Sequence, residues 1–204
     1  MNLVFTWIQW CGKWTQARIL IDNYWFEIVE MWWELRKIAQ EDSDFWKKIK
    51  EIIEWWNLVT PDMISDIIKK VILENEWKKM IFDGFIRNVW NKESFETVCK
   101  DYKVVFFNLS EEKAKNRLLW RMFDPLTQET FTSGTLVNPK TWTELIKRKD
   151  DNEESILTRI NSFINITLPV VEEQREEWKV IDIDADQSIE DVSCEIVKKL
   201  NLNK

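Results

Sequence analysis

Residues 2–18 read NLVFTWIQWCGKWTQAR, and the fold of the chain can be predicted from this segment. An apolar run from Asn2 to Thr6 leads into a short loop around Gly12 and Lys13, and a helical pattern begins at Lys13. With glycine in place of tryptophan at positions 7, 10 and 14, the loop reads GIQGCGKGTQAR. A strand, a glycine-rich loop with a lysine and a helix together wrap backbone N–H groups around a phosphate. The stretch therefore predicts a phosphate-binding loop if the tryptophans stand where glycines belong.

The tryptophan content supports this interpretation. The chain has 14 Trp and 3 Gly, which together come close to the share of about 7% that glycine alone normally takes. Trp32–Trp33 and Trp55–Trp56 are adjacent pairs, which cannot share one helix face. Trp46 and Trp90 lie inside helical patterns and support the idea least. Four tryptophans follow predicted helices, where a left-handed residue favours glycine: Trp25, Trp56, Trp77 and Trp178.

We infer that these tryptophans are glycines of the native protein. The hypothesis is that the gene comes from a lineage that reads UGA as glycine, and that the codon is decoded here as tryptophan. An indole at position 7, 10 or 14 would occupy the space that a phosphate needs in the loop.

Composition excludes several classes of function. The formal net charge of -7 argues against a nucleic-acid partner, because a phosphate backbone demands a basic surface. The chain has no histidine, so it has no imidazole base and no histidine metal ligand. No apolar run approaches a membrane span, and three widely spaced cysteines form no disulfide framework. We expect a cytoplasmic, monomeric protein of one domain with insertions, away from membranes.

Short apolar runs alternate with longer runs of 3.6-residue period, the pattern of βαβ units around a parallel sheet. We expect five strands, at residues 2–6, 26–31, 79–83, 103–108 and 179–184. Predicted helices cover residues 13–22, 34–39, 44–55, 61–74, 92–100, 111–121, 151–173 and 189–200. Between Arg121 and Lys149 the apolar period disappears, which is typical of a functional loop such as a lid. The fold class is therefore α/β.

With glycines restored, the chain resembles the adenylate kinase family of P-loop nucleoside monophosphate kinases over its full length. GxxGxGKGTQA is that family's phosphate loop, with Thr15 one place later than in the general P-loop pattern. IFDGFIRN is similar to the family's DGFPR signature, with Ile86 replacing the proline. Further resembling segments are MWWELR, NLVTPD, RLLWRMFDPLTQETF and RKDDNEESILTR. The resemblance implies a P-loop NTPase-type five-stranded parallel sheet with a core of residues 1–30, 57–120 and 149–204, an NMP-binding insertion at 31–56 and a lid at 121–148.

The resemblance also implies the roles of individual residues. Mg²⁺ with ATP is the expected cofactor, and Asp83 would orient water on it. The catalytic set would be Lys13, Asp83, Arg87, Arg121, Arg148 and Arg159. ATP would contact Trp10, Cys11, Gly12, Lys13, Trp14, Thr15, Arg117, Arg121, Thr130, Phe131 and Gln187. AMP would contact Met31, Arg36, Asn57, Leu58, Val59, Gly84, Phe85, Ile86, Arg87, Asn91, Arg148 and Arg159.

Three functions remain open on the sequence. The first is an ATP:AMP phosphotransferase, which needs no histidine because the attacking phosphate of AMP is already an anion. The second is a UMP/CMP kinase of the same fold, since Asn88 and Asn91 stand where the family usually has Thr and Gln and Met31 replaces a threonine. The lid segment resembles the long lid of bacterial adenylate kinases, whereas pyrimidine kinases commonly have a short one, and this favours AMP as the acceptor. The third is a non-catalytic, tryptophan-rich binding protein, if the tryptophans are real.

Overall fold

The computed structural model describes residues 1–8, 12–31, 33–34, 37, 61–75, 78–127, 129–131, 134–147 and 151–203, without the side chains of residues 61–64. The strands of its main sheet are β1 (Asn2–Trp7), β2 (Phe26–Glu30), β3 (Lys79–Asp83), β4 (Tyr102–Asn108) and β7 (Val180–Asp184). The helices include α1 (Lys13–Tyr24), α4 (Pro61–Glu74), α5 (Val89–Val98), α6 (Glu111–Leu119) and α9 (Ile189–Lys199). All five predicted strands are confirmed, with ends that differ by at most one residue.

The five strands form one parallel sheet in the order β2-β3-β1-β4-β7. The central strand β1 pairs with β3 on one side and β4 on the other, so the chain winds in both directions from it. Open parallel sheets bind ligands outside the carboxyl ends of their strands, at such a switch point. Trp7, Asp83 and Asn108 end the three central strands at this edge.

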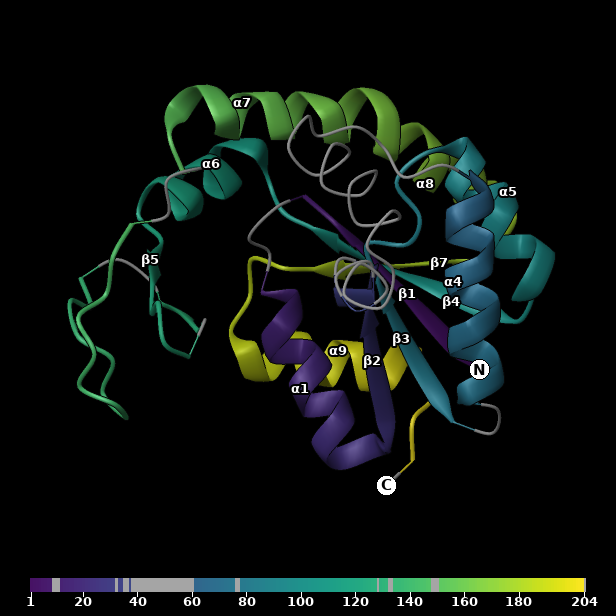
Figure 1. Cartoon of the computed structure of the whole chain (residues 1–204), viewed down its shortest axis with the longest axis horizontal. Helices are drawn as coiled ribbons and strands as arrows, with labels where there is room; N and C mark the ends of the chain where they lie inside the picture. Colours follow the sequence, from purple (N-terminus) through teal and green to yellow (C-terminus); the bar gives the residue numbers. More distant parts are fainter. Residues whose placement is uncertain are drawn as a thin grey trace.

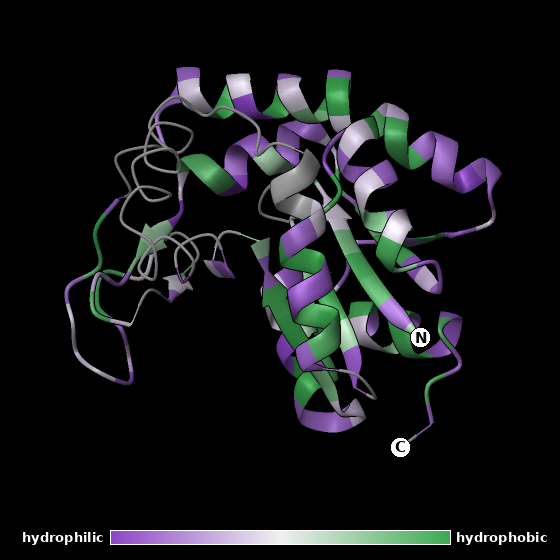
Figure 2. Ribbon diagram, turned by 45° about the vertical axis from the view of Figure 1, so that its right-hand side comes forward, coloured by the Kyte–Doolittle hydropathy of each residue, from purple (hydrophilic) through white to green (hydrophobic). Residues whose placement is uncertain are grey.

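Side chains alternate between the two faces of the sheet and fill two cores. Leu3 and Phe5 of β1 join the core that is covered by α1, α6, α7 (Glu153–Ser162) and α9. Val4 of the same strand joins the core under α4 and α5, together with Phe82 and Phe95. Figure 1 shows helices on both faces of the sheet, and Figure 2 shows the strands between them as largely hydrophobic. The expected α/β architecture is confirmed.

The long helix expected at residues 151–173 is wrong as a single α-helix. The structure has α7 (Glu153–Ser162), a π-helical segment η1 (Phe163–Thr167) and α8 (Leu168–Glu176). The N–H of Leu168 donates to the carbonyl of Phe163, five residues back. Pro169 in the first turn of α8 has no N–H to donate, so the regular helical ladder cannot continue through it. The three segments still run as one rod across the top of Figure 1.

The predicted loop between Arg121 and Lys149 has more structure than expected. It contains a two-stranded antiparallel sheet of β5 (Met122–Phe123) and β6 (Thr130–Phe131), and two isolated bridges that join Phe123 to Ile146 and Val137 to Glu144. This unit follows α6 and projects away from the main sheet, at the left of Figure 1.

Several predictions lie outside the described residues. These are the helix at 44–55, most of the helix at 34–39, and the site residues Trp10, Cys11, Arg36, Asn57, Leu58, Val59 and Arg148. In the part of the chain that the structure describes, no helix has both the length and the apolar character needed to cross a membrane.

Candidate active site

The loop between β1 and α1 leads into the helix through a glycine in the left-handed region. Gly12 has φ 86° and is the N-cap of α1, where its carbonyl accepts hydrogen bonds from the N–H groups of Thr15 and Gln16 at 3.1 and 3.3 Å. Residues with a Cβ rarely adopt this conformation, so glycine is needed here. Lys13, Trp14 and Thr15 form the first turn of α1, and Trp14 and Thr15 are exposed. The positive end of the helix dipole and these exposed residues face the loop.

Lys13 makes a direct ion pair with Asp83. Its Nζ lies 2.7 Å from Oδ1 and 2.7 Å from Oδ2 of the carboxylate. Asp83 is the last residue of β3, is buried and stands opposite Phe5 of β1. The sheet therefore brings together a cation from the loop and a carboxylate from the neighbouring strand, as the DGF segment predicts.

The indole of Trp7 covers the ammonium group of Lys13, whose Nζ is 3.1 Å from the ring centroid. Such a cation–π contact holds the lysine against the ring. Trp7 ends β1, directly before the loop. An indole here lies against the charged group that a phosphate should contact, which is the conflict expected from the sequence.

On the other side of Asp83, the chain turns through Gly84, which has φ 77°. A Cβ built at Gly84 would lie 3.1 Å from Nη2 of Arg87, so the absence of a side chain lets the guanidinium pack across the turn. Arg87 is exposed, whereas Phe85 and Ile86 are buried in the core under α4 and α5. Phe85 and Ile86 can therefore offer an acceptor only their backbone groups.

Asn91 and Met31 are both buried. Asn91 is 4% exposed, and its Oδ1 accepts a hydrogen bond from the backbone N–H of Arg87 at 3.3 Å. Met31 follows β2 and is 6% exposed within the same core as Phe85. Asn91 thus supports the turn of Arg87 from the interior and Met31 packs in the core, placements that the sequence did not predict.

Two arginines meet one buried carboxylate at the base of the lid. Arg121 binds Asp151 through Nε at 2.6 Å and through Nη2. Nη2 of Arg159 lies 3.4 Å from Oδ1 of the same carboxylate. The side chain of Asp151 is 1% exposed. The lid entrance, the lid exit and α7 thus converge on Asp151, which orients two of the predicted catalytic cations.

Arg117 of α6 reaches the turn after β7. Its Nη1 donates to the carbonyl of Ala185 at 3.4 Å, and its Nη2 lies 3.6 Å from Asp186. Lys113, one helical turn earlier, also pairs with Asp186. Gln187 instead donates to Glu195 of α9 at 2.7 Å. The structure brings Arg117 and the turn at 185–188 together, and Asp186 joins them without having been predicted.

The two lid residues predicted for ATP lie on β6. Thr130 is exposed and Phe131 is half-buried. Both residues belong to the projecting unit that follows α6.

The buried carboxylate of Asp124 organises that projecting unit. It accepts hydrogen bonds from the N–H groups of Leu126 and Thr127 at 2.8 and 3.2 Å, from the side-chain amide of Asn138 and from the hydroxyl of Thr141. Burial raises the pKa of Asp124, but these hydrogen bonds outweigh it and lower the pKa to about 2. As an anion, Asp124 therefore fixes the shape of the projecting unit.

Comparisons with known proteins agree with this geometry. The family model described as adenylate kinase matches residues 9–179. An adenylate kinase of Hydrogenobaculum sp. (strain Y04AAS1) is 31% identical over 193 residues, which cover 89% of this chain and 91% of that relative. An adenylate kinase of Chloroherpeton thalassium is 28% identical over 200 residues, covering 91% of each chain. UMP-CMP kinase 3 of Oryza sativa subsp. japonica is 30% identical over 183 residues, covering 89% of this chain and 76% of that relative.

Proposed function

This chain belongs to the adenylate kinase family, and on that premise we propose that it transfers a phosphoryl group between ATP and AMP, with two ADP as products. The observation that carries the proposal is the pairing of Lys13 with Asp83 at 2.7 Å, at the sheet edge where the phosphate loop enters α1. Arg87 leaves the same turn, and Arg121 and Arg159 converge at the base of the lid.

The chemistry needs cations more than it needs a base. The attacking oxygen of AMP belongs to a phosphate that is already ionised, so no residue has to remove a proton. Charge develops on the transferring group, and guanidinium and ammonium groups that are already in place stabilise it without reorganisation. Lys13 would contact the β and γ oxygens of ATP. Arg87 and Arg159 would hold the acceptor phosphate, and Arg121 would bind the triphosphate in place of Asp151.

Asp83 suits Mg²⁺ that arrives with ATP. Among the described residues, no three cysteine, aspartate or glutamate side chains gather into a metal cage. Mg²⁺ usually keeps several waters and uses one or two carboxylates together with substrate phosphates, which a single strand-end carboxylate satisfies. The ion neutralises charge on the phosphates when bound. Asp83 would hold its waters, and Thr15 lies in the turn beside it.

The chain would work as a cytoplasmic monomer with a core of residues 1–30, 57–120 and 149–204. Residues 31–56 would cover the acceptor and residues 121–148 would cover ATP, since water must be kept from the transferring group. The projection of β5 and β6 from the end of α6 supports a separate lid.

For the acceptor nucleotide, specific observations also support an alternative to AMP. Asn91 replaces the family's glutamine, and a rice relative named UMP-CMP kinase 3 is 30% identical, so CMP or UMP is the second candidate acceptor. A buried polar group left unpaired against the wrong base costs about 1–3 kcal/mol. The test is kcat/KM for AMP, CMP, UMP and GMP at fixed ATP. We expect AMP to be preferred by at least about tenfold, and a preference for CMP or UMP would move the chain to the pyrimidine branch.

We also propose that the native protein has glycine where this sequence has tryptophan. Trp25, Trp142 and Trp178 have φ of 62°, 59° and 60°, in the left-handed region. Their exposed fractions are 87%, 83% and 87%, so their indoles bury almost nothing. A bulky residue that takes a glycine conformation and packs against nothing is what glycine replacement produces.

Four further tryptophans are also largely exposed, in agreement with this proposal, whereas Trp7 is half-buried against the core. Trp14, Trp33, Trp90 and Trp120 are 47%, 52%, 64% and 61% exposed, although large aromatic side chains normally bury most of their surface. Intact mass spectrometry of the native protein, with the codons of the gene, tests the proposal. We expect UGA codons and a mass well below 24.8 kDa. A mass of 24.8 kDa would instead favour a tryptophan-rich binding protein.

A further inference from the structure

Two side chains form hydrogen bonds with the backbone of Arg87, one with its N–H and one with its carbonyl. Its N–H donates to Oδ1 of Asn91 at 3.3 Å, and its carbonyl accepts a hydrogen bond from Oγ1 of Thr167 at 3.0 Å. Asn91 is itself fixed, because its N–H donates to Oδ1 of the N-cap Asn88 at 2.8 Å. The direction in which the Arg87 side chain leaves the turn therefore depends on partners from α5 and from η1.

Thr167 reaches Arg87 from the end of the π-helical segment. η1 closes with the N–H of Leu168 bonded to the carbonyl of Phe163, so the segment contains one residue more than an α-turn. One additional residue rotates everything that follows by about 100° relative to α7. Single π-turns inside helices are common at functional sites. Here the π-turn ends at the residue whose hydroxyl meets the turn after β3.

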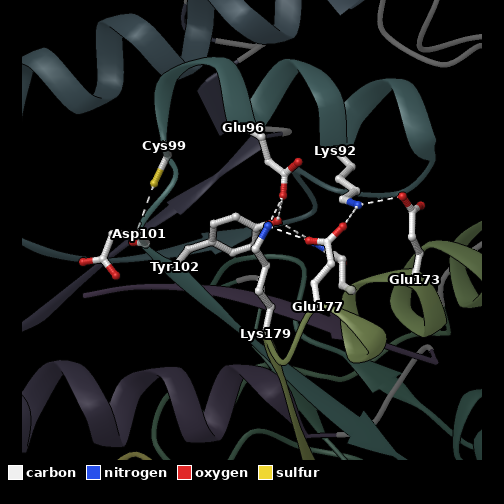
Figure 3. Close-up of polar contacts among 9 residues, drawn as sticks. Lys92, Glu96, Cys99, Asp101, Tyr102, Glu173, Glu177 and Lys179 are labelled. Carbon is white, nitrogen blue, oxygen red and sulfur yellow. Dashed lines mark hydrogen bonds and ion pairs between the residues drawn. The ribbon is translucent and has the colours of Figure 1, made fainter.

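Ion pairs join α5 to α8, the two helices that follow Arg87 and Thr167. Nζ of Lys92 in α5 lies 2.8 Å from Glu173 and 2.5 Å from Glu177 at the far end of α8. The Lys92 side chain is 5% exposed. Figure 3 shows Lys92 between these two carboxylates, with Lys179 and Tyr102 extending the network to Glu96. Arg87 directly precedes α5 and Lys92 lies in the first turn of α5. The Thr167 hydroxyl and the Lys92 ion pairs therefore fasten the N-terminal end of α5 to the two ends of α8.

We propose that Thr167 is a positioning residue for the acceptor site, which acts by fixing the backbone of Arg87 so that the guanidinium meets the acceptor phosphate. This inference rests on the proposed function of Arg87. The rod of α7, η1 and α8 contacts Arg87 through Thr167 and also carries Arg159, so a single continuous element supports two of the cations proposed for the acceptor site (Figure 1).

The test compares Thr167→Val, which keeps the shape and removes the hydroxyl, with Thr167→Ser, which keeps the hydroxyl. The matched control is Thr158→Val, because Thr158 is an exposed residue of α7 whose hydroxyl bonds only the carbonyl of Glu154 in its own helix. All variants are made in protein that carries glycine at the tryptophan positions. We expect Thr167→Val to lower kcat/KM for AMP roughly three- to tenfold with KM for ATP unchanged, and Thr167→Ser to stay within about twofold of the parent. Equal kinetics of Thr167→Val and Thr158→Val would overturn the proposal.

A second readout separates this inference from the proposed reaction. Hydrogen exchange of the backbone amides in residues 84–91 reports the order of the Arg87 turn without any turnover. We expect faster exchange there in Thr167→Val than in Thr167→Ser or Thr158→Val. If the parent phosphorylates no nucleoside monophosphate but this difference appears, the positioning of Arg87 stands and the reaction fails. Unchanged exchange in Thr167→Val overturns the positioning role itself.

Discussion

Lys13 and Asp83 hold each other across two strands, with the lysine Nζ at 2.7 Å from both carboxylate oxygens. The ion pair joins the first turn of α1 to the end of β3. The ring centroid of Trp7 lies 3.1 Å from the same lysine Nζ. A phosphate bound by Lys13 would compete with Asp83 for the ammonium group, and the indole of Trp7 would obstruct its approach. These contacts explain why tryptophan is unsuitable at position 7.

The first prediction concerns the phosphate loop. In the literal chain, ATP binding should be weak, and the joint change Trp7→Gly, Trp10→Gly and Trp14→Gly should strengthen it by at least about tenfold, because the backbone N–H groups can then approach a phosphate. Isothermal titration with ATP measures the effect. The control is Trp90→Gly, since Trp90 is an exposed residue of α5 outside the loop. An equal affinity of the triple variant and the literal chain would contradict the prediction.

The second prediction separates the Cβ from the indole. In otherwise glycine-carrying protein, a version that keeps Trp25 should be less stable than the all-glycine version by about 1 kcal/mol, because a left-handed residue with a Cβ is strained. The Trp25→Ala version should lose a similar amount of stability relative to the all-glycine version. A version that keeps Trp90 instead should lose nothing, because glycine is the weaker residue inside a helix. Urea denaturation measures all four. Full stability with alanine at position 25 would refute the conformational explanation.

The third prediction concerns Arg87. Arg87→Ala should lower kcat roughly 10²- to 10³-fold while the midpoint of thermal unfolding moves little, because the side chain is exposed and serves the transferring group. Arg87→Lys should recover only part of the rate, since an ammonium group cannot bind a phosphate in bidentate fashion. Arg18→Ala is the matched control, an exposed arginine of α1 that lies 3.9 Å from Glu129. A rate of Arg87→Ala close to that of Arg18→Ala would remove Arg87 from the site.

The fourth prediction is a pH dependence of the lid. The pKa of Asp124 is about 2 in the folded lid, against about 3.9 for an unfolded aspartate. A lowered pKa stabilises the fold above pH 4, and this contribution is lost as the pH falls from about 4 toward 2. Proteolysis or hydrogen exchange of residues 122–147 should therefore accelerate in that window, before the sheet responds.

Two variants check the assignment to Asp124. Asp124→Asn should open the lid already at pH 7 and flatten the dependence between about pH 4 and 2. Glu144→Gln removes an exposed carboxylate of the same unit and should leave the profile of the parent. A parent-like profile in Asp124→Asn would assign the acid sensitivity to other groups.

The sequence predicted the parallel sheet because each strand is a short apolar run between turn residues, as in Lys79 to Asp83. It also predicted the left-handed turns at Trp25 and Trp178, since both follow helical runs. The turn at Trp142 was not predicted, because it lies in the lid and follows no helix. The break at Thr167 was missed although Pro169 signals it, since the apolar period continues through the proline.

Contacts between residues far apart in the sequence explain why parts of the candidate site were not predicted. Lys13, Asp83 and Arg87 could be predicted as site residues because each lies within a local motif. The contact of Thr167 with Arg87 joins residues 80 positions apart, and the role of Asp151 depends on two chain segments that meet beyond the lid. The interior position of Asn91 depends on the turn that it caps. No periodicity or spacing in one sequence encodes such pairings.

With glycine at its tryptophan positions, this member of the adenylate kinase family should transfer a phosphoryl group from ATP to AMP. The most direct measurement follows ADP formation from ATP and AMP with the glycine-carrying protein and the literal chain side by side. We predict two ADP for each ATP and AMP consumed by the glycine-carrying protein, and a rate at least about 100-fold lower for the literal chain. No AMP-dependent ADP formation by a folded glycine-carrying protein, or equal rates for the two, would contradict the account.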